Sequence, residues 1–386
     1  MVAFLFGAGA EVGFNLCGGE NFAKSVLGIN SNEINEAIKD FYSDKLESLK
    51  NNRWYPYQYY STAWKLDDLL KASVKKKFLT TKSFERKKEY DDLLSKEVSE
   101  LKKSDEETQN IFIGQYTSYM GIIDEYFHTL ISPVQLGPKK FWDVINCYTR
   151  AYLTIVSDIL YDKKPTSEEY IKLLKDPKET YKRVIDKCDS LCGVSSYYSI
   201  VKSHFKDNEF GTITTNYTPL CTMLTGCTNT AYIHGKINLF ESPYENKVYD
   251  VTDERFEYPK DIIFPYLFIQ SGIKPVIDQC QLNEYSKMLK ILDETQILII
   301  VGYRLNPDDN HINSLIRSFI TDNRKNNKVI FFDFNGEKKN TLTEELRLSE
   351  HPRNLEVIEI NKYNCLSEFE RVIKKIKQTN KTDEEK

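Results

Sequence analysis

The sequence has few of the features that mark membrane, secreted or nucleic-acid-binding proteins. No apolar run approaches the roughly 20 residues that a helix needs to cross a bilayer. The apolar start at residues 2–6 is short and lacks the basic residues of a signal peptide. A net charge of −4 gives no general attraction to nucleic acid or to anionic membranes. We therefore expect a cytoplasmic protein without direct contact to nucleic acid or membrane.

The eight cysteines are scattered along the chain, which does not suggest a secreted disulfide scaffold. Four of them are candidates for a metal site: Cys188, Cys192, Cys221 and Cys227. The first two are one helical turn apart, but neither pair has the usual CxxC spacing of a zinc site. We therefore interpret the four as structural cysteines and expect no metal site.

The composition predicts a globular protein with two structural units. The chain has 386 residues, of which 40% are apolar and 28% charged, so it can bury at least one large core. Helical periodicity with charged faces dominates residues 31–205, which we expect to form a large inserted helical domain. Its basic clusters are interleaved with acids and are interpreted as solvated helix faces. Residues 1–30 and 206–376 are expected to form one domain, and residues 377–386 a disordered tail.

Strand-like and helix-like segments alternate in the two flanking parts. Apolar or β-prone runs predict strands over residues 2–6, 211–214, 231–233, 296–301, 329–335 and 355–360. The stretch after Gly235 is interpreted as loop-rich, because it contains Pro243, Pro259, Pro265 and Pro275. The alternation predicts an α/β fold with a Rossmann-like, doubly wound parallel sheet.

A glycine-rich segment follows the first predicted strand directly. Gly7, Gly9 and Gly13 form the pattern G-x-G-x-x-x-G, one residue longer than the usual dinucleotide fingerprint. Small residues let a pyrophosphate approach the backbone, and the start of a helix attracts its charge. We expect a helix to begin here and the turn to hold phosphates. The alternative is a tight strand-to-helix turn that binds nothing.

Polar side chains also follow the next two predicted strands. Thr215 and Asn216 come after one strand, and His234 comes after the other. The carboxyl ends of parallel strands lie at one edge of a sheet, which is where open α/β sheets bind ligands. Asn216 and His234 are therefore candidates for catalysis. Alternatively, Asn216 caps the following helix and His234 is a hydrogen-bonded core imidazole.

His311 stands at the start of a predicted helix, with Asp308 and Asp309 just before it. Residues at this position either cap the helix or serve as ligands, and the sequence does not separate the two roles.

Five short segments occur in the order and spacing found in sirtuins: Gly7–Ala10, Thr215–Tyr217, Ile233–Gly235, Val301–Leu305 and the strand end at Asn335. The chain resembles more closely the sirtuin-like NADases of bacterial antiphage defence. A GYSLN…DxHI string is common in those proteins, and here residues 302–306 read GYRLN and residues 309–312 read DNHI. The resemblance covers residues 1–25 and 211–360 and hardly touches the helical insertion.

The resemblance implies that Asn216 and His234 are the catalytic pair and that NAD+ is the substrate. It also implies a set of cofactor-binding residues: Gly7, Ala8, Gly9, Glu11, Thr215, Gly302, Tyr303 and Asn335. Glu11 either contacts a ribose or favours the helix start. Tyr303 and Phe14 either line the NAD+ pocket or pack in the core.

Three departures from the sirtuin pattern bear on the activity. The two CxxC pairs that hold structural zinc in the protein deacylases are missing, since only Cys280 lies between His234 and Cys365. Thr218 stands where those enzymes have an acidic residue. The G-I-P-x-F-R string after the glycine turn is replaced by residues 13–16, which read GFNL. We therefore expect no zinc, and an enzyme poorly equipped to present acyl-lysine that still binds NAD+ and admits water.

These features together predict an NAD+ glycohydrolase that releases nicotinamide and ADP-ribose as an effector of abortive antiphage defence. Unrestrained NAD+ hydrolysis is toxic, so we expect control by self-assembly into a homo-oligomer or by a partner subunit. The resemblance suggests a HerA-type ATPase ring, an Argonaute-type complex or a nucleotide-sensing protein as the partner. Two other functions stay open, a zinc-free protein deacylase and a non-catalytic module that senses NAD+ or ADP-ribose.

Overall fold

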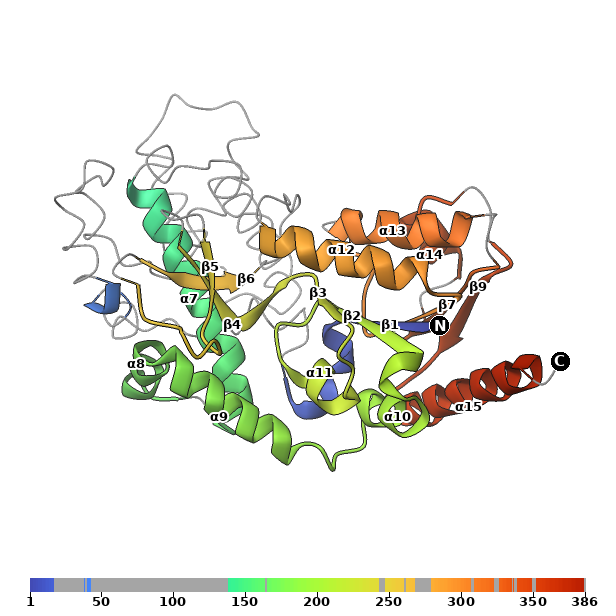
Figure 1. Ribbon diagram of the computed structural model, residues 1–386, viewed down its shortest axis with the longest axis horizontal. Coiled ribbons are helices and arrows are strands. Elements are labelled where there is room, and N and C mark those ends of the chain that lie inside the picture. The colour runs from blue at the N-terminus through green and yellow to red at the C-terminus, as the bar shows by residue number, and fades with distance from the viewer. Residues whose placement is uncertain are drawn as a thin grey trace, which may run out of the picture.

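The chain folds around two β-sheets (Figure 1). The computed structural model describes residues 1–16, 38, 40–42, 138–163, 165–242, 247–259, 262–267, 279–306, 309–322, 326–334, 336, 339–348 and 352–384. Most of the predicted helical insertion, and the predicted site residue Asn335, lie outside these ranges. None of the helices in the described part of the chain has the length and apolar content needed to cross a bilayer.

The larger sheet has six strands, and every neighbouring pair in it is parallel. Its order is β3-β2-β1-β7-β8-β9. The strands are β1 (Val2–Phe6), β2 (Phe210–Thr214), β3 (Thr230–Tyr232), β7 (Ile297–Val301), β8 (Lys328–Asp333) and β9 (Leu355–Glu359). All six predicted strands are therefore present, and the order reverses between β1 and β7. This confirms the Rossmann-like, doubly wound α/β fold.

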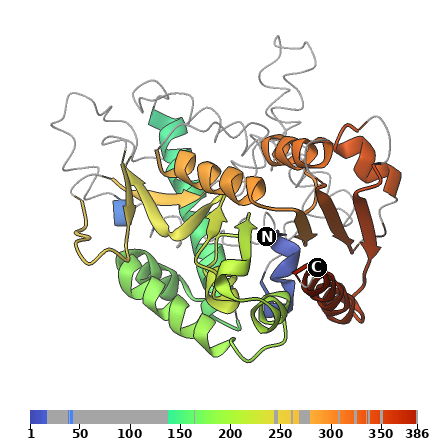
Figure 2. The same ribbon diagram turned by 45° about the vertical axis from the view of Figure 1, so that its right-hand side comes forward.

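Helices cover both faces of this sheet. Alternate residues of a strand point to opposite faces, so each strand contributes side chains to two cores. Phe4 and Phe6 of β1 face the core beneath α10 (Tyr197–His204), α11 (Leu220–Thr225) and α15 (Cys365–Glu384). Ala3 and Leu5 face the core beneath α12 (Gln279–Asp293), α13 (Asn310–Thr321) and α14 (Lys339–Glu345). Figures 1 and 2 show α12 and α13 on one side of the sheet and α10 and α15 on the other. The central strand is thus buried on both faces.

The prolines after Gly235 predicted a loop-rich stretch, but three segments among its described residues are strands. They form a second, antiparallel sheet of β4 (Gly235–Ser242), β5 (Lys247–Asp250) and β6 (Phe264–Leu267), in the order β5-β4-β6. The prolines misled the interpretation because Pro265 lies in β6, a short edge strand, where a missing N–H is tolerated.

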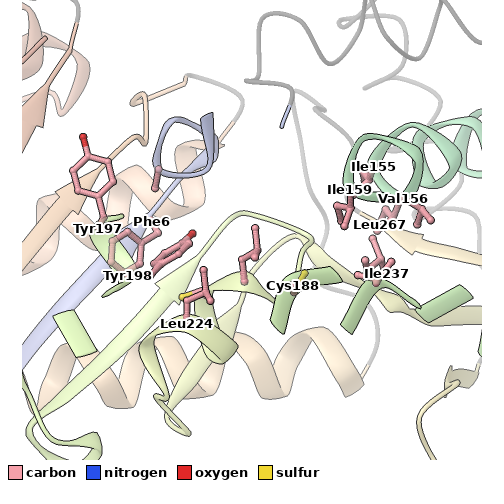
Figure 3. Packing of buried hydrophobic residues seen from close by; sticks show 14 of the residues in the cluster. Phe6, Ile155, Val156, Ile159, Cys188, Tyr197, Tyr198, Leu224, Ile237 and Leu267 are labelled. Atoms are coloured by element: carbon pink, nitrogen blue, oxygen red, sulfur yellow. The ribbon is translucent and has the colours of Figure 1, made fainter. Parts of the chain in front are cut away.

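Helices of the predicted insertion pack on this second sheet. α7 (Pro138–Leu160) and α9 (Pro177–Ser190) contact its strands, and α8 (Ser167–Lys175) packs against these two helices. The Tyr152 ring of α7 lies against Phe240 of β4, with ring centroids 5.5 Å apart. Figure 3 shows side chains of α7 beside Ile237 and Leu267 of the same small sheet. This part of the insertion and the segment after Gly235 therefore share one core.

Helices cross or lie beside two of the predicted domain boundaries, those at residues 206 and 377. α10 lies before residue 206, yet it packs on the large sheet, where the Tyr198 ring meets Phe6 edge to face at 4.8 Å (Figure 3). α15 continues past Ile376 to Glu384 and so occupies most of the predicted disordered tail. Lys377 within this last part pairs with Glu209, which ties the helix to the segment before β2. The range 31–205 stays a prediction.

Candidate active site

The predicted site residues come shortly after a row of four paired residues that runs across the large sheet. Tyr232, Thr214, Phe6 and Val301 lie side by side in β3, β2, β1 and β7. The hydrogen-bond ladder continues one residue further, since the N–H of Thr215 donates to Phe6 O (3.1 Å). Asn216 and His234 each come two residues after this row. The register therefore brings both to the carboxyl edge of the sheet, which is the edge where open α/β sheets bind ligands.

The glycine turn after β1 packs directly against the turn after β7. Gly7 N donates to Val301 O (3.0 Å) and Gly9 N to Gly302 O (2.9 Å). A Cβ on Gly7 would lie 2.5 Å from the carbonyl oxygen of Gly302, and Gly302 itself has a positive φ of 66°. The glycines are therefore needed for the close approach of two backbone turns.

The expected helix does not begin in this turn. Two 3₁₀ turns, η1 (Ala8–Ala10) and η2 (Val12–Phe14), follow β1 instead. The N–H groups of Gly7, Gly9, Ala10 and Glu11 all donate to backbone carbonyls. A pyrophosphate bound here therefore cannot use these four donors, and in the described residues the turn offers no α-helix N-terminus. The physical reason is that the glycines let the chain fold back onto Gly302 before a helix can form.

Asn216 lies in a buried network of polar side chains. Its Nδ2 donates to Gly7 O (3.1 Å) and to the hydroxyl of Tyr198 (3.3 Å). Tyr198 in turn donates to Glu11 Oε1 (3.0 Å), as does the hydroxyl of Thr218 (2.8 Å). A carbonyl oxygen only accepts, and Tyr198 uses its single hydrogen on the carboxylate. The amide must therefore turn its nitrogen inward, which leaves Oδ1 as the acceptor.

This polarity makes Asn216 an oriented acceptor rather than a helix cap. Within the described part of the chain, no hydrogen bond reaches its Oδ1, and α11 begins only at Leu220 with Pro219 as its N-cap. The capping interpretation of Asn216 is therefore wrong. The oxygen is available to a hydroxyl group or to water at the carboxyl edge of the sheet.

Glu11 anchors the network and carries an unusual pKa. Burial raises the pKa of its carboxyl group from 4.5 to about 7, although the hydrogen bonds from Thr218, Tyr198 and Asn216 lower it. Burial also raises the pKa of Tyr198 well above 10, so that this residue stays a neutral donor. Glu11 faces these side chains from inside the protein. Its carboxyl group accepts hydrogen bonds from the side chains around Asn216 and makes no cap hydrogen bond to a helix.

The raised pKa of Glu11 predicts a pH-dependent stability. The folded state holds the proton more tightly than the unfolded state, so the free energy of unfolding is highest below about pH 4.5 and falls as the pH rises to about 7. The pKa difference corresponds to about 3 kcal/mol at most. Glu11→Gln keeps the site neutral, so we expect it to raise the Tm at pH 8 and to have little effect at pH 5, measured by thermal unfolding. A lower Tm than wild type at pH 8 would mean that the ionised carboxylate stabilises the fold.

His234 pairs with an acidic residue that is distant in the sequence. Its Nε2 lies 3.1 Å from Oδ1 of Asp309, and both side chains are more than nine-tenths buried. Asp309 is the N-cap residue of α13, but its carboxylate makes no cap hydrogen bond to the helix. It is directed to His234 instead, and a carboxylate in this position fixes the orientation of an imidazole. His311, on the first turn of α13, lies with these two, the ligand atoms of all three being within 4.8 Å of one another.

The other predicted residues divide into three groups. Thr215 is half-buried in the same edge, and Ala8 and Gly9 lie on the glycine turn. Tyr303 is buried in the core under α13, where its hydroxyl donates to Asn313 Oδ1 (2.9 Å). The four candidate cysteines are free thiols, and burial raises the pKa of Cys188 to about 12. No group of cysteines in the described ranges has the spacing of metal ligands.

A cavity of about 600 Å³ lies beside the end of the glycine turn. Phe14, Asn15 and Leu16 line it together with residues of α7, α8 and α9. Asn216 and His234 are not among the lining residues. Phe14 therefore borders a space large enough for part of a dinucleotide, but this space is separate from the predicted catalytic pair.

Sequence reasoning placed Asn216 and His234 at the ends of neighbouring strands but did not predict the residues that contact them. Tyr198 carries no sequence signal, because it lies in a helix of the predicted insertion. Asp309 and His311 were noticed for their place before a helix and not for their contact with His234. Comparison of the chain with models of known protein families gives no match, and a search of curated proteins gives none either.

Proposed function

We propose that the chain is an NAD+ glycohydrolase that cleaves the bond between nicotinamide and ribose. The observation that carries this proposal is the held orientation of Asn216. Its Nδ2 donates to Gly7 O and to the Tyr198 hydroxyl, which leaves Oδ1 as an acceptor. Asn216 and His234 each follow a paired residue of the sheet, Thr214 and Tyr232, by two positions. An acceptor and an imidazole together suit a sugar ring that must be oriented and a water that must lose a proton.

The reaction divides between the two residues. The C1′–N bond of the nicotinamide ribose breaks with its electron pair going to nicotinamide, which leaves an oxocarbenium-like sugar. Water attacks C1′, and its proton passes to His234 or to solvent. Asn216 Oδ1 accepts a hydrogen bond from the water or from a ribose hydroxyl and so fixes the direction of attack. The Asp309 carboxylate orients the His234 ring and stabilises its protonated form.

The resemblance of the residue pattern to sirtuin-like NADases supports the same assignment. It also motivates the proposal that the enzyme acts in antiphage defence and is held inactive until it assembles with itself or with a partner subunit. Toxicity in cells that express the wild-type chain, relieved by His234→Ala, would support this part.

The activity is best tested under single-turnover conditions, with the purified chain in excess over NAD+. Such conditions detect slow hydrolysis by an enzyme that is not activated. We expect equal amounts of nicotinamide and ADP-ribose, measured by chromatography, and none above background from His234→Ala. Equal background release from wild type and variant would contradict the proposal.

Two other functions predict different products from the same assay. A zinc-free deacylase would release nicotinamide only when an acyl-lysine peptide is added. A non-catalytic sensor would bind NAD+ or ADP-ribose without releasing nicotinamide. The buried Asp309–His234 pair favours catalysis over sensing, because a binding module has no need of an oriented proton acceptor.

A further inference from the structure

His234, Asp309 and His311 bring three metal-binding groups together from two elements. His234 follows β3, whereas Asp309 and His311 stand at the start of α13. The Nε2 of His234 and the Oδ1 of Asp309 are 3.1 Å apart, and each ligand atom of the three lies within 4.8 Å of the others. Two ligands of a tetrahedral zinc ion, each about 2.0–2.1 Å from the metal, are separated by about 3.3 Å. The first pair already has this spacing, and His311 needs to approach by at most about 1.5 Å.

The chemistry of the three groups selects the kind of ion. Two imidazoles and one carboxylate suit Zn²⁺ and similar transition ions, whereas Mg²⁺ and Ca²⁺ prefer sites built from oxygen alone. Three protein ligands leave a fourth position open for water. The ring of Tyr285 packs against His311 with centroids 5.5 Å apart, and its buried hydroxyl has no hydrogen-bond partner among the described residues. A donor is therefore available close to the three ligands.

We infer that His234, Asp309 and His311 bind a divalent transition ion such as Zn²⁺, and that the bound ion inhibits the enzyme. The inhibitory part rests on the proposed function, because a metal bound to His234 occupies the ring nitrogen that Asp309 orients. The imidazole then neither takes a proton nor turns toward the sugar. The bound ion would inhibit NAD+ hydrolysis, and removal of the metal would restore the activity.

The binding part is tested without any assay of activity. The chain is freed of metal with a chelator and titrated with Zn²⁺, and with Co²⁺ as a spectroscopic probe. We expect one tight Zn²⁺ per chain and the strong visible absorption of tetrahedral Co²⁺ without thiolate charge-transfer bands. Since loss of a residue that merely supports a ligand lowers metal affinity about ten- to hundredfold, His311→Ala is expected to lower it by at least about a hundredfold.

Two further variants separate loss of a ligand from loss of folding. Asp309→Asn keeps a hydrogen-bonding group beside His234 but is a poorer ligand, so it should weaken Zn²⁺ binding while the Tm of the metal-free chain stays near that of wild type. His204→Ala is the matched control, because His204 also pairs with a carboxylate, that of Glu370 at 3.5 Å, but lies on α10. Equal Zn²⁺ affinity in wild type and His311→Ala, or equal weakening by His204→Ala, would overturn the site.

The inhibitory part has its own readout. Zn²⁺ should suppress nicotinamide release by the wild-type chain, and His311→Ala should keep its own metal-free rate at the same Zn²⁺ concentration. Hydrolysis without Zn²⁺ uptake would overturn the metal site and leave the proposed function intact. Zn²⁺ uptake by a chain that never releases nicotinamide would overturn the function and the inhibition, and leave the site intact.

Discussion

His234→Ala is expected to lower the rate of nicotinamide release by about a hundred- to ten-thousandfold, the usual effect of removing a general base. The imidazole is buried, and its Nε2 lies 3.1 Å from Oδ1 of Asp309, which fixes the orientation of the ring. The measurement is the single-turnover rate at saturating NAD+. NAD+ binding should change much less than the rate, because the residue acts on the attacking water.

Asn216 variants test the oriented amide within the same prediction. Asn216→Ala removes the acceptor and should lower the rate by a similar factor. Asn216→Asp keeps an acceptor but no longer donates to Gly7 O and Tyr198, so it should lose both rate and thermal stability. His204→Ala serves as the control and should keep the wild-type rate. A rate within tenfold of wild type in both His234→Ala and Asn216→Ala would show that the catalytic groups lie elsewhere.

Gly302→Ala is expected to destabilise the fold by at least about 4 kcal/mol, which is among the largest effects of single substitutions. The new Cβ would lie 2.2 Å from the backbone nitrogen of Ala10, and the φ of 66° is itself unfavourable for alanine. Backbone atoms cannot rotate away as a side chain can. A fall in Tm of roughly 10 °C or more, or loss of the folded protein, should follow in thermal unfolding.

Two other glycines separate the causes of this effect. Gly336 has the same φ of 66° but open space around its Cβ position, so Gly336→Ala measures the strain alone, about 1–2 kcal/mol. Gly13 has neither the contact nor the positive φ, and Gly13→Ala should be close to neutral. If Gly302→Ala were no worse than Gly336→Ala, the close approach of the two turns would not be real.

The fold could largely be predicted from the sequence because its strands are buried on both faces. Runs such as VAFLF and ILIIV have no polar residue, which is the signal of a central parallel strand. The antiparallel sheet was missed because its strands are short and one of them contains Pro265. The glycine turn was misread for a different reason. The same small residues that admit a phosphate also admit another stretch of backbone, and only the position of Gly302 distinguishes the two.

The site was predictable where it depends on the ends of neighbouring strands and unpredictable where it depends on distant contacts. Asn216 and His234 follow paired residues of β2 and β3, so alternating strand and helix patterns are enough to place both at one edge of the sheet. The hydrogen bond from Tyr198 to Glu11 joins residues 187 positions apart. No periodicity reports a contact of that range, and the same holds for the pairing of His234 with Asp309.

The most direct test of the proposed function is a crystal structure of the chain with a non-hydrolysable NAD+ analogue. We predict that the nicotinamide ribose lies within hydrogen-bond distance of Asn216 Oδ1 and next to His234, at the carboxyl edge of the large sheet. An analogue bound with its nicotinamide ribose away from both residues, for example wholly within the cavity lined by Phe14, Asn15 and Leu16, would contradict the assignment of the active site.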